Sequence, residues 1–282
     1  MKTLLSLVFF ITAFLHLCGK PNILLIMADD MGYSDLGCFG GEIRTPSLDS
    51  LAENGIRFTS FYSENMCWVS RASMLTGVYH RTSLKNGTLH PNCITLPEVL
   101  KQNGYATGMM GKWHLAGKFL QNNGQDAVYP DQRGFDYFYG ILGGASSFYA
   151  PFGLKRNRDS IDHEFMNDEN YYFTNAIGDE AISFLKQTPD QKPFFLYLPF
   201  TAAHWPLHAP VKDIEKYKGV FSEGWDQLRS NRLERMKKIG VIGKSVKLSP
   251  RHPKVPSWKD EKHKDWQERR MEVYAAQVTI MD

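Results

Sequence analysis

Cysteine, net charge and long apolar runs are all scarce in this sequence. Four cysteines among 282 residues are too few for a disulfide-rich scaffold, and the pattern leaves open whether Cys38 and Cys93 pair. A net charge of +3 with a pI near 8.5 gives little support for nucleic-acid binding, because no basic run is interleaved with aromatics. The basic residues between positions 229 and 270 are mixed with acids, which predicts a solvated surface. We therefore expect no nucleic-acid partner.

One long apolar run is present, at the N-terminus, in the segment MKTLLSLVFFITAFLHLCGK. It extends from Leu4 to Leu17 after a single early lysine, a length typical of a signal peptide and short for a stable membrane span. LHLC resembles a lipoprotein cleavage site at Cys18, but His16 and Leu17 are poor replacements for the small residues of such a site. We predict that residues 1–19 are a signal peptide and that the mature protein is periplasmic or extracellular, where calcium is plentiful.

The rest of the chain alternates short apolar runs with amphipathic segments. Strands are expected at residues 23–27, buried on both faces, and in YATGMMGKWH and PFFLYLPFTAAHWPLHAP. Helices are expected in TPSLDSLAENG, TLPEVLKQNG and TNAIGDEAISFLKQTP. This alternation predicts an α/β fold with a mixed, largely parallel sheet flanked by helices on both faces.

Local signals support the expected helices. Thr45 can cap the first of them, and Thr95 and Glu98 have the spacing of a capping box at the start of the second. The third carries one apolar stripe, made of Ile177, Ala181, Phe184 and Leu185.

The C-terminal segment RRMEVYAAQVTIMD has Met271, Tyr274, Ala275 and Val278 on one helical face. No glycine, proline or capping residue ends this helix before Asp282. We expect the chain to be the N-terminal part of a longer protein.

Polar side chains follow three of the expected strands, at the sheet edge where sites form in α/β proteins. Asp29 and Asp30 follow the first strand, Lys112 and His114 the second, and His204 the third. Two adjacent carboxylates suit a hard cation, although a helix N-cap or a solvated turn uses the same residues. The pair Lys112 and His114, two positions apart in an extended segment, would point the same way, as a cation beside a proton carrier. A surface lysine with a hydrogen-bonded histidine, and a satisfied buried His204, are the alternatives.

The segment CWVSRASMLTG places Cys67 at the expected start of a helix. A lone cysteine is ordinarily a small buried hydrophobe. At a helix start, however, free backbone N–H groups and the helix dipole favour negative charge, and Arg71 lies one turn further on. These local features indicate an anion-handling nucleophile.

CWVSRASMLTG is similar to the sulfatase signature C-x-P-S-R-x-x-x-L-T-G, and PNILLIMADDMGYSDLGCFGG resembles the metal-binding opening of that family. Three further segments resemble sulfatase blocks in the family's order: TLPEVLKQNGYATGMMGKWHL, RGFDYFYG and TAAHWPLHAP. The resemblance covers residues 21–282, and the region from GWDQLRSNRLERMKKIGVI onward is most similar to bacterial arylsulfatases. It implies an alkaline-phosphatase-like α/β sandwich, of which residues 20–282 are the N-terminal part of the catalytic domain.

Sulfatases hydrolyse sulfate esters with formylglycine, made from the signature cysteine by a maturase. The resemblance implies that Cys67 becomes this aldehyde, and that one hydroxyl of its hydrate attacks sulfur and displaces an alcohol or phenol. His114 would act as the base that releases sulfate. Ca²⁺, in preference to Mg²⁺, would be held by Asp29 and Asp30 and would contact the modified Cys67.

The same resemblance implies the sulfate-binding residues. Lys112 and His204 would bind the sulfate oxygens, His204 would also protonate the leaving group, and Arg71 would order the nucleophile. The implied substrate is an aryl sulfate or a sulfated carbohydrate. The aromatic segment FDYFYG, residues 135–140, is more readily explained by packing than by a ring-binding pocket.

Two departures from the family pattern matter. Val69 stands where the signature has proline, and because β-branched valine also tolerates extended backbone we expect conversion of Cys67 to proceed. A later pair of metal ligands and a second lysine of the family have no counterpart before Asp282. We therefore expect these 282 residues alone to bind Ca²⁺ poorly and to be nearly inactive. The alternatives are a phosphonate or phosphate ester hydrolase of the same superfamily and a catalytically silent homologue that binds sulfated glycans.

Overall fold

The computed structural model describes residues 19–117 and 127–282. The predicted signal peptide lies outside these residues, except for Gly19. Within the described ranges, no helix is both long and apolar enough to cross a bilayer.

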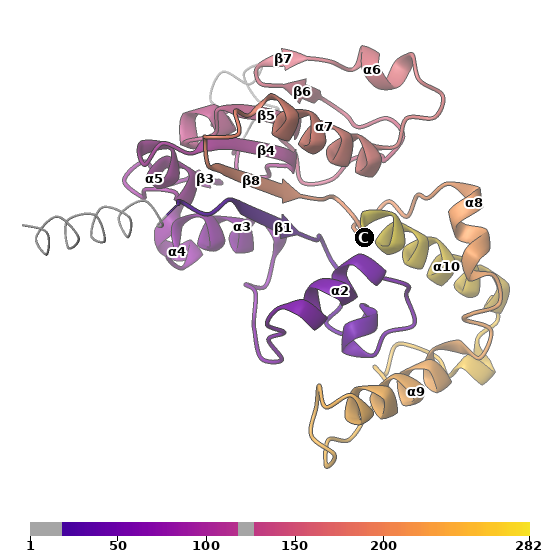
Figure 1. The fold of residues 1–282 in the computed structure, drawn as a ribbon. Helices are drawn as coiled ribbons and strands as arrows, with labels where there is room; N and C mark the ends of the chain where they lie inside the picture. Colours follow the sequence, from indigo (N-terminus) through magenta and orange to yellow (C-terminus); the bar gives the residue numbers. More distant parts are fainter. Residues whose placement is uncertain (1–18, 118–126) are drawn as a thin grey trace, which may run out of the picture.

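A six-stranded sheet forms the centre of the molecule, with strand order β1-β8-β4-β5-β6-β7 (Figure 1). The first four strands in this order run parallel to one another, and β6 pairs antiparallel with both β5 and β7. The predicted mixed, largely parallel sheet is confirmed. The strands are β1 (Ile23–Met27), β8 (Phe194–Pro199), β4 (Ala106–Lys112), β5 (Tyr137–Ile141), β6 (Leu154–Arg156) and β7 (Asp159–Ser160), and a separate hairpin joins β2 (Leu84–Lys85) to β3 (Thr88–Leu89).

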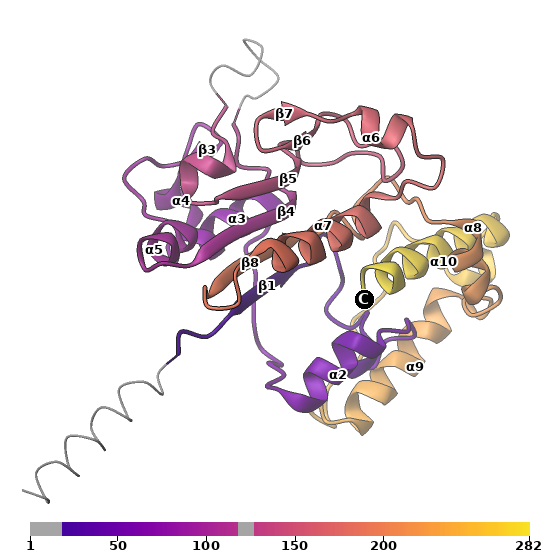
Figure 2. The same ribbon diagram turned by 45° about the horizontal axis from the view of Figure 1, so that its top comes forward.

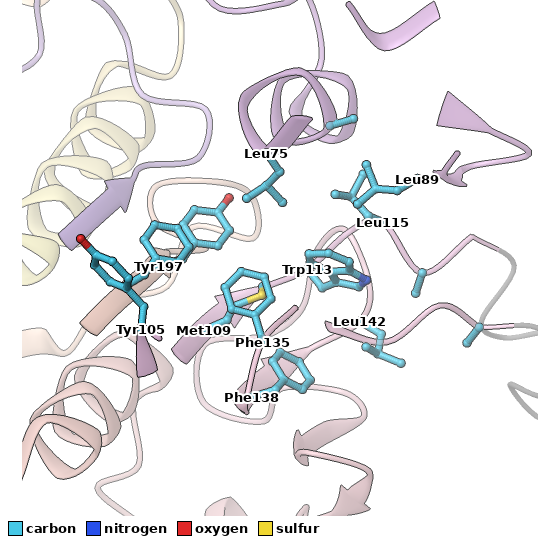
Figure 3. Close-up of a cluster of buried hydrophobic side chains, with 14 residues drawn as sticks. Leu75, Leu89, Tyr105, Met109, Trp113, Leu115, Phe135, Phe138, Leu142 and Tyr197 are labelled. Atoms are coloured by element: carbon cyan, nitrogen blue, oxygen red, sulfur yellow. The ribbon is translucent and has the colours of Figure 1, made fainter. Parts of the chain in front are cut away.

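Helices cover both faces of this sheet because successive strand residues point to opposite sides. On β4, Met109 packs with Ala72 and Leu75 of α3 (Cys67–Thr76), whereas Met110 packs with Ile177 of α7 (Phe173–Gln187). The cluster on the α3 face is aromatic: Trp113 and Tyr197 lie within it (Figure 3). Helices α4 (His80–Ser83) and α5 (Leu96–Gln102) lie on the same side as α3, and α7 lies opposite (Figure 1).

A further group of elements lies beyond the carboxyl ends of β1 and β8 (Figure 2). Its core joins Ala275 and Val278 of α10 to Ile43, Ala203 and Tyr217, so the predicted C-terminal helix and its buried face are confirmed. The group contains α2 (Pro46–Asn54), α8 (Val211–Ile214), α9 (Gly224–Lys238) and α10 (Lys264–Met281). The remaining short helices are η1 (Gly37–Phe39), η3 (Pro130–Arg133), α6 (His163–Met166), η4 (Glu215–Tyr217) and η5 (Trp258–Asp260).

Of the two predicted helix starts, one has the expected cap. At α5, the Thr95 hydroxyl accepts from the Glu98 N–H at 3.3 Å, and the Thr95 N–H donates to Glu98 Oε2 at 2.7 Å, which completes the capping box. The prediction that Thr45 caps α2 is wrong. Its hydroxyl instead accepts from the Gly37 N–H at 2.9 Å and donates to Asp49 Oδ1 at 3.0 Å.

The prediction that the first strand is buried on both faces is also wrong. Ile23, Leu25 and Met27 pack into the α3-side core, but the side chains of Leu24 and Ile26 are 52% and 41% exposed. This difference arises because β1 is an edge strand and α7 packs mainly over β4, β5 and β8. One residue of the predicted α7 stripe, Leu185, is also partly exposed, at 37%.

Two smaller questions from the sequence are also answered. Cys38 and Cys93 are both free thiols and do not form a disulfide with each other. In the segment 135–140, Phe135 and Phe138 are buried in the α3-side core (Figure 3). Tyr139 is buried in the core on the opposite face, so all three side chains serve packing.

Candidate active site

The nucleophile candidate Cys67 is the first residue of α3, as predicted. Met66 precedes it in extended conformation, so the chain enters the helix directly at the cysteine. Cys67 Sγ lies 3.3 Å from Nδ1 of His114, which follows β4. The end of one strand and the start of one helix thus bring a sulfur atom and an imidazole into hydrogen-bonding range.

A buried carboxylate with two cations lies beside this pair. Lys112 Nζ donates to Asp29 Oδ2 at 2.5 Å, and Arg71 Nη2 lies 3.4 Å from Asp29 Oδ1. Arg71 also donates from Nη1 to the Lys112 carbonyl at 2.9 Å. All three side chains are buried, and within the described ranges the Nε of Arg71 has no hydrogen-bond partner. One carboxylate facing two cations leaves an excess positive charge, which favours an anionic ligand.

The prediction that Lys112 and His114 share an extended segment is wrong, although Lys112 still lies close enough to His114 for its positive charge to act on that ring. The strand ends at Lys112, and His114 has a φ of 56°, in the left-handed region. This turn directs Lys112 toward Asp29 and the His114 ring toward Cys67. A non-glycine residue in this conformation carries backbone strain, which folded proteins often retain at functional sites.

Gly144 is a site residue that sequence reasoning missed. A Cβ atom at this position would lie 2.4 Å from Nε2 of His114, so only glycine leaves room for the ring. Gly144 lies shortly after β5, which neighbours the strand that carries Lys112. The paired glycines that follow this strand in the sequence were the available signal.

Burial of His114, reinforced by the nearby positive charges of Lys112 and Arg71, lowers its pKa to about 4. The ring is therefore neutral at ordinary pH and can accept a proton. This protonation state agrees with the role of a base that the sequence predicted for it.

The depressed pKa predicts how stability depends on pH. An unfolded histidine titrates near pH 6.5, so between about pH 6.5 and 4 the unfolded chain binds a proton that the folded chain does not. We expect the free energy of unfolding to fall as the pH is lowered through this window, and to fall less in His114→Gln. Urea unfolding at a series of pH values measures this difference, and parallel pH profiles for the two proteins would contradict it.

The second carboxylate, Asp30, does not belong to the buried ion-pair cluster and pairs with His204. Its backbone is left-handed, with a φ of 55°, and its side chain is 57% exposed. His204 Nε2 lies 3.4 Å from Asp30 Oδ2, and His204 Nδ1 is 2.6 Å from the Trp205 carbonyl, to which it donates when it carries the proton. His204 is partly exposed at 24%, so it is not the satisfied buried histidine of the alternative reading.

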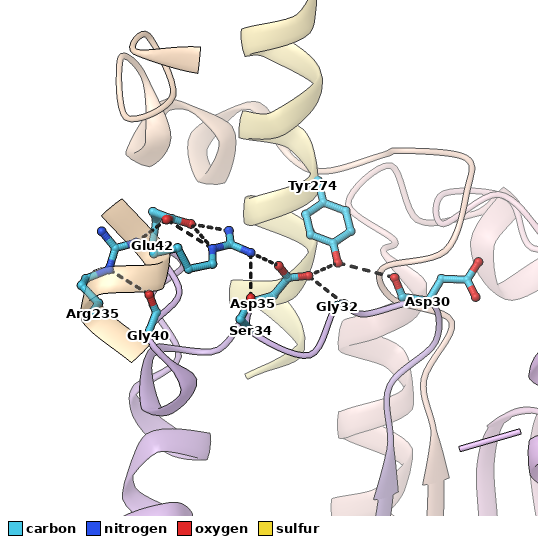
Figure 4. Close-up of polar contacts among 9 residues, drawn as sticks. Asp30, Gly32, Ser34, Asp35, Gly40, Glu42, Arg235 and Tyr274 are labelled. Atoms are coloured by element: carbon cyan, nitrogen blue, oxygen red, sulfur yellow. Dashed lines mark hydrogen bonds and ion pairs between the residues drawn. The ribbon is translucent and has the colours of Figure 1, made fainter. Parts of the chain in front are cut away.

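The loop after β1 is held by residues distant in the sequence (Figure 4). Tyr274 of α10 donates to Asp35 Oδ2 at 2.6 Å, and its hydroxyl lies 3.5 Å from the Asp30 carbonyl. Asp35 also accepts from Arg232 of α9 at 2.9 Å, and Arg232 in turn pairs with Glu42. Helices α9 and α10 therefore fix the backbone that carries Asp30. Periodicity could not reveal this support, because its members are up to 244 residues apart.

Asp29 and Asp30 have the right donor chemistry for a hard cation but are too few. Ca²⁺ takes six to eight oxygen ligands, and two carboxylates supply at most four. Within residues 19–117 and 127–282, no group of three or more His, Cys, Asp or Glu side chains could hold a metal ion. Asp29 is also neutralised by Lys112 and Arg71. These residues fit one part of a cation site, and the remaining oxygens must come from elsewhere.

A known family matches the part of the chain that carries these residues. The family model described as Sulfatase matches residues 21–282. The chain belongs to the sulfatase family. Its α/β architecture is the alkaline-phosphatase-like one that the sequence implied.

Two curated relatives of this sulfatase are an uncharacterized sulfatase of Schizosaccharomyces pombe and an arylsulfatase of Klebsiella aerogenes. The first is 36% identical over 300 residues and the second 33% identical over 297, and each alignment covers 93% of this chain. The chain spans 52% and 60% of the lengths of these relatives.

A solved structure, that of Ps i-CgsB in complex with k-i-k-neocarrahexaose, is also similar. It is 29% identical, with a TM-score of 0.61, and the match covers 79% of this chain and 56% of that one.

Proposed function

We propose that the complete protein hydrolyses sulfate monoesters, with Cys67 in its formylglycine form as the nucleophile. The observation that carries the proposal is the placement of Cys67 at a helix start, 3.3 Å from His114 and beside the Asp29, Lys112 and Arg71 cluster, in a sulfatase chain. When formed, the hydrated aldehyde supplies one hydroxyl that attacks sulfur and a second through which sulfate is released.

The surrounding side chains have separable tasks. Neutral His114 accepts a proton at Nδ1, the atom that faces position 67. Arg71 has a buried Nε without a partner among the described residues, which suits it to bind an anionic oxygen. Lys112 uses one of its ammonium protons on Asp29 and has others for a sulfate oxygen. His204, with Asp30 beside Nε2, protonates the leaving oxygen from that nitrogen.

Ca²⁺ is the cation we propose, with Asp29 and Asp30 among its ligands and further oxygens from outside the described residues. Bound there, it would polarise the sulfate oxygens. We propose export to the periplasm or the cell exterior, a formylglycine-generating maturase as partner, and an aryl or carbohydrate sulfate as substrate.

The family match favours sulfate esters over phosphate and phosphonate esters. The model described as Sulfatase covers residues 21–282, which include every candidate site residue. This match is our reason to rank a phosphate or phosphonate ester hydrolase second.

The test combines mass spectrometry with a matched pair of substrates. The complete natural chain, coexpressed with a maturase, should yield a Cys67 peptide with the mass loss of thiol-to-aldehyde conversion. It should also release the phenol faster from an aryl sulfate than from the corresponding aryl phosphate. If Cys67 stays unmodified although the same maturase converts a control substrate, Cys67 is not the proposed formylglycine nucleophile. That result would favour a catalytically silent homologue that binds sulfated glycans. Faster phosphate release would favour the second reading.

A further inference from the structure

A pocket of about 540 Å³ opens next to the candidate active site, between α9 and α10. Asp30 and Ala203 line one side of it. These residues adjoin Asp29 and His204, so the pocket begins where the leaving group of a bound ester would lie. The other walls include Trp205, Trp225, Arg229 and Arg270.

Two of the pocket's arginines lack a carboxylate partner. Arg232, which also lines the pocket, is neutralised by Asp35 and Glu42. By contrast, Arg229 and Arg270 form no ion pair with any carboxylate in the described part of the chain. Arg229 donates to the Ser249 carbonyl at 2.8 Å.

Arg270 has more hydrogen-bonding capacity than its neighbours use. Its Nη1 donates to Gln267 at 2.9 Å, while its buried Nε has no partner among the described residues. Its guanidinium carbon lies 5.3 Å from the centre of the Trp205 ring, and Trp205 is 57% exposed. A partly desolvated cation thus lies against an open aromatic face, and a buried donor without an acceptor costs free energy until a ligand supplies one.

We propose that this pocket binds the alcohol part of the ester and that this alcohol is a saccharide carrying a second anionic group. The inference rests on the proposed function. The apolar face of a sugar ring stacks on Trp205, and a sulfate or carboxylate group on the same sugar accepts hydrogen bonds from Arg270, with Arg229 as a second cation. A neutral phenol would leave the Arg270 donor unsatisfied, so a plain aryl sulfate uses the pocket poorly.

The position of His204 supports this assignment. Ala203 and Trp205, which line the pocket, flank His204 on both sides in the sequence. Protonation of the leaving oxygen by His204 therefore places the departing sugar at the pocket entrance.

Binding to a protein that cannot turn over tests the inference without depending on catalysis. In the complete natural chain carrying Cys67→Ala, calorimetry would compare mixed disulfated isomers of a methyl hexoside with the monosulfated isomers. We expect the disulfated ligands to bind at least about tenfold more tightly, as expected for a charged hydrogen-bonded contact. Arg270→Gln in the same protein should remove most of this difference.

A matched control comes from the adjacent residue of α10. Arg269 does not line the pocket and pairs with Glu215 and Glu272, so Arg269→Gln should keep the preference for disulfated ligands. If circular dichroism shows that Arg270→Gln does not fold, Arg229→Gln replaces it as the test. We expect Arg229→Gln to reduce the preference for disulfated ligands by a smaller factor. Equal affinity for the two ligand sets, or equal effects of the variants at 269 and 270, would overturn the subsite. Tight disulfated-sugar binding by a protein whose unmutated form hydrolyses no sulfate ester would refute the proposed function and leave the subsite standing.

Discussion

Replacement of Cys67 by alanine is expected to lower sulfate ester hydrolysis by a factor of at least about 10³ in the complete, matured protein. Losses of this size follow removal of a covalent nucleophile, because the remaining groups only bind and polarise the substrate. Initial rates with an aryl sulfate, compared with those of the unmutated protein from the same maturase-containing host, measure the effect.

Cys93→Ala provides the control. Cys93 is also a free thiol, but its sulfur donates to the Thr82 carbonyl at 3.7 Å, away from the cluster around Asp29. We expect its activity to remain within about twofold of the unmutated protein, as for a change away from the reacting groups. Comparable activity of the Cys67 variant and the unmutated protein would exclude a nucleophile at position 67.

Replacement of Lys112 by methionine is expected to lower the free energy of unfolding by about 2 kcal/mol, because the buried Asp29 carboxylate loses the charged hydrogen bond from its closer cation and keeps only Arg71. Lys112 is 0% exposed and Asp29 only 3%, and the remaining cation, Arg71, is 3.4 Å from the carboxylate. Methionine keeps the length of the side chain and removes the charge. Urea unfolding in metal-free buffer at neutral pH gives the free energy.

A surface ion pair of nearly equal length serves as the comparison. Lys101 Nζ lies 2.6 Å from Asp136 Oδ1, but their side chains are 48% and 36% exposed. We expect Lys101→Met to cost less than about 1 kcal/mol, because water screens exposed pairs. Similar losses for the two variants would show that burial of the Asp29 cluster does not determine its contribution to stability.

The elements that were predicted correctly are those whose signals are local. The capping box of Thr95 and Glu98 and the apolar runs that became β1, β4 and β8 depend on neighbouring residues, so one stretch of chain contains all the information. The start of α3 at Cys67 was found for the same reason. Thr45 failed because its hydroxyl had a better partner in η1, several residues away.

The sequence predicted which residues belong to the candidate site better than it predicted how they are arranged. Sheet topology brings together the polar residues that follow parallel strands. The sequence therefore predicted that Asp29 and Lys112 belong to one site. The sequence could not predict that these consecutive acids have different surroundings. Asp29 lies in a buried cluster, whereas Asp30 is largely exposed. Gly144 went unnoticed although the paired glycines are visible in the sequence, because the need for space at that position depends on where the His114 ring lies in the folded chain.

The sequence by itself determined the strands β1, β4 and β8, the α/β class and the candidate residues of the site, because propensity, capping and motif spacing act over short separations. The tertiary structure alone decided that β1 is an edge strand, that Asp29 is shared by Lys112 and Arg71, and that a pocket forms between α9 and α10. Each of these depends on contacts between segments far apart in the chain, and such contacts exist only once the whole core has packed.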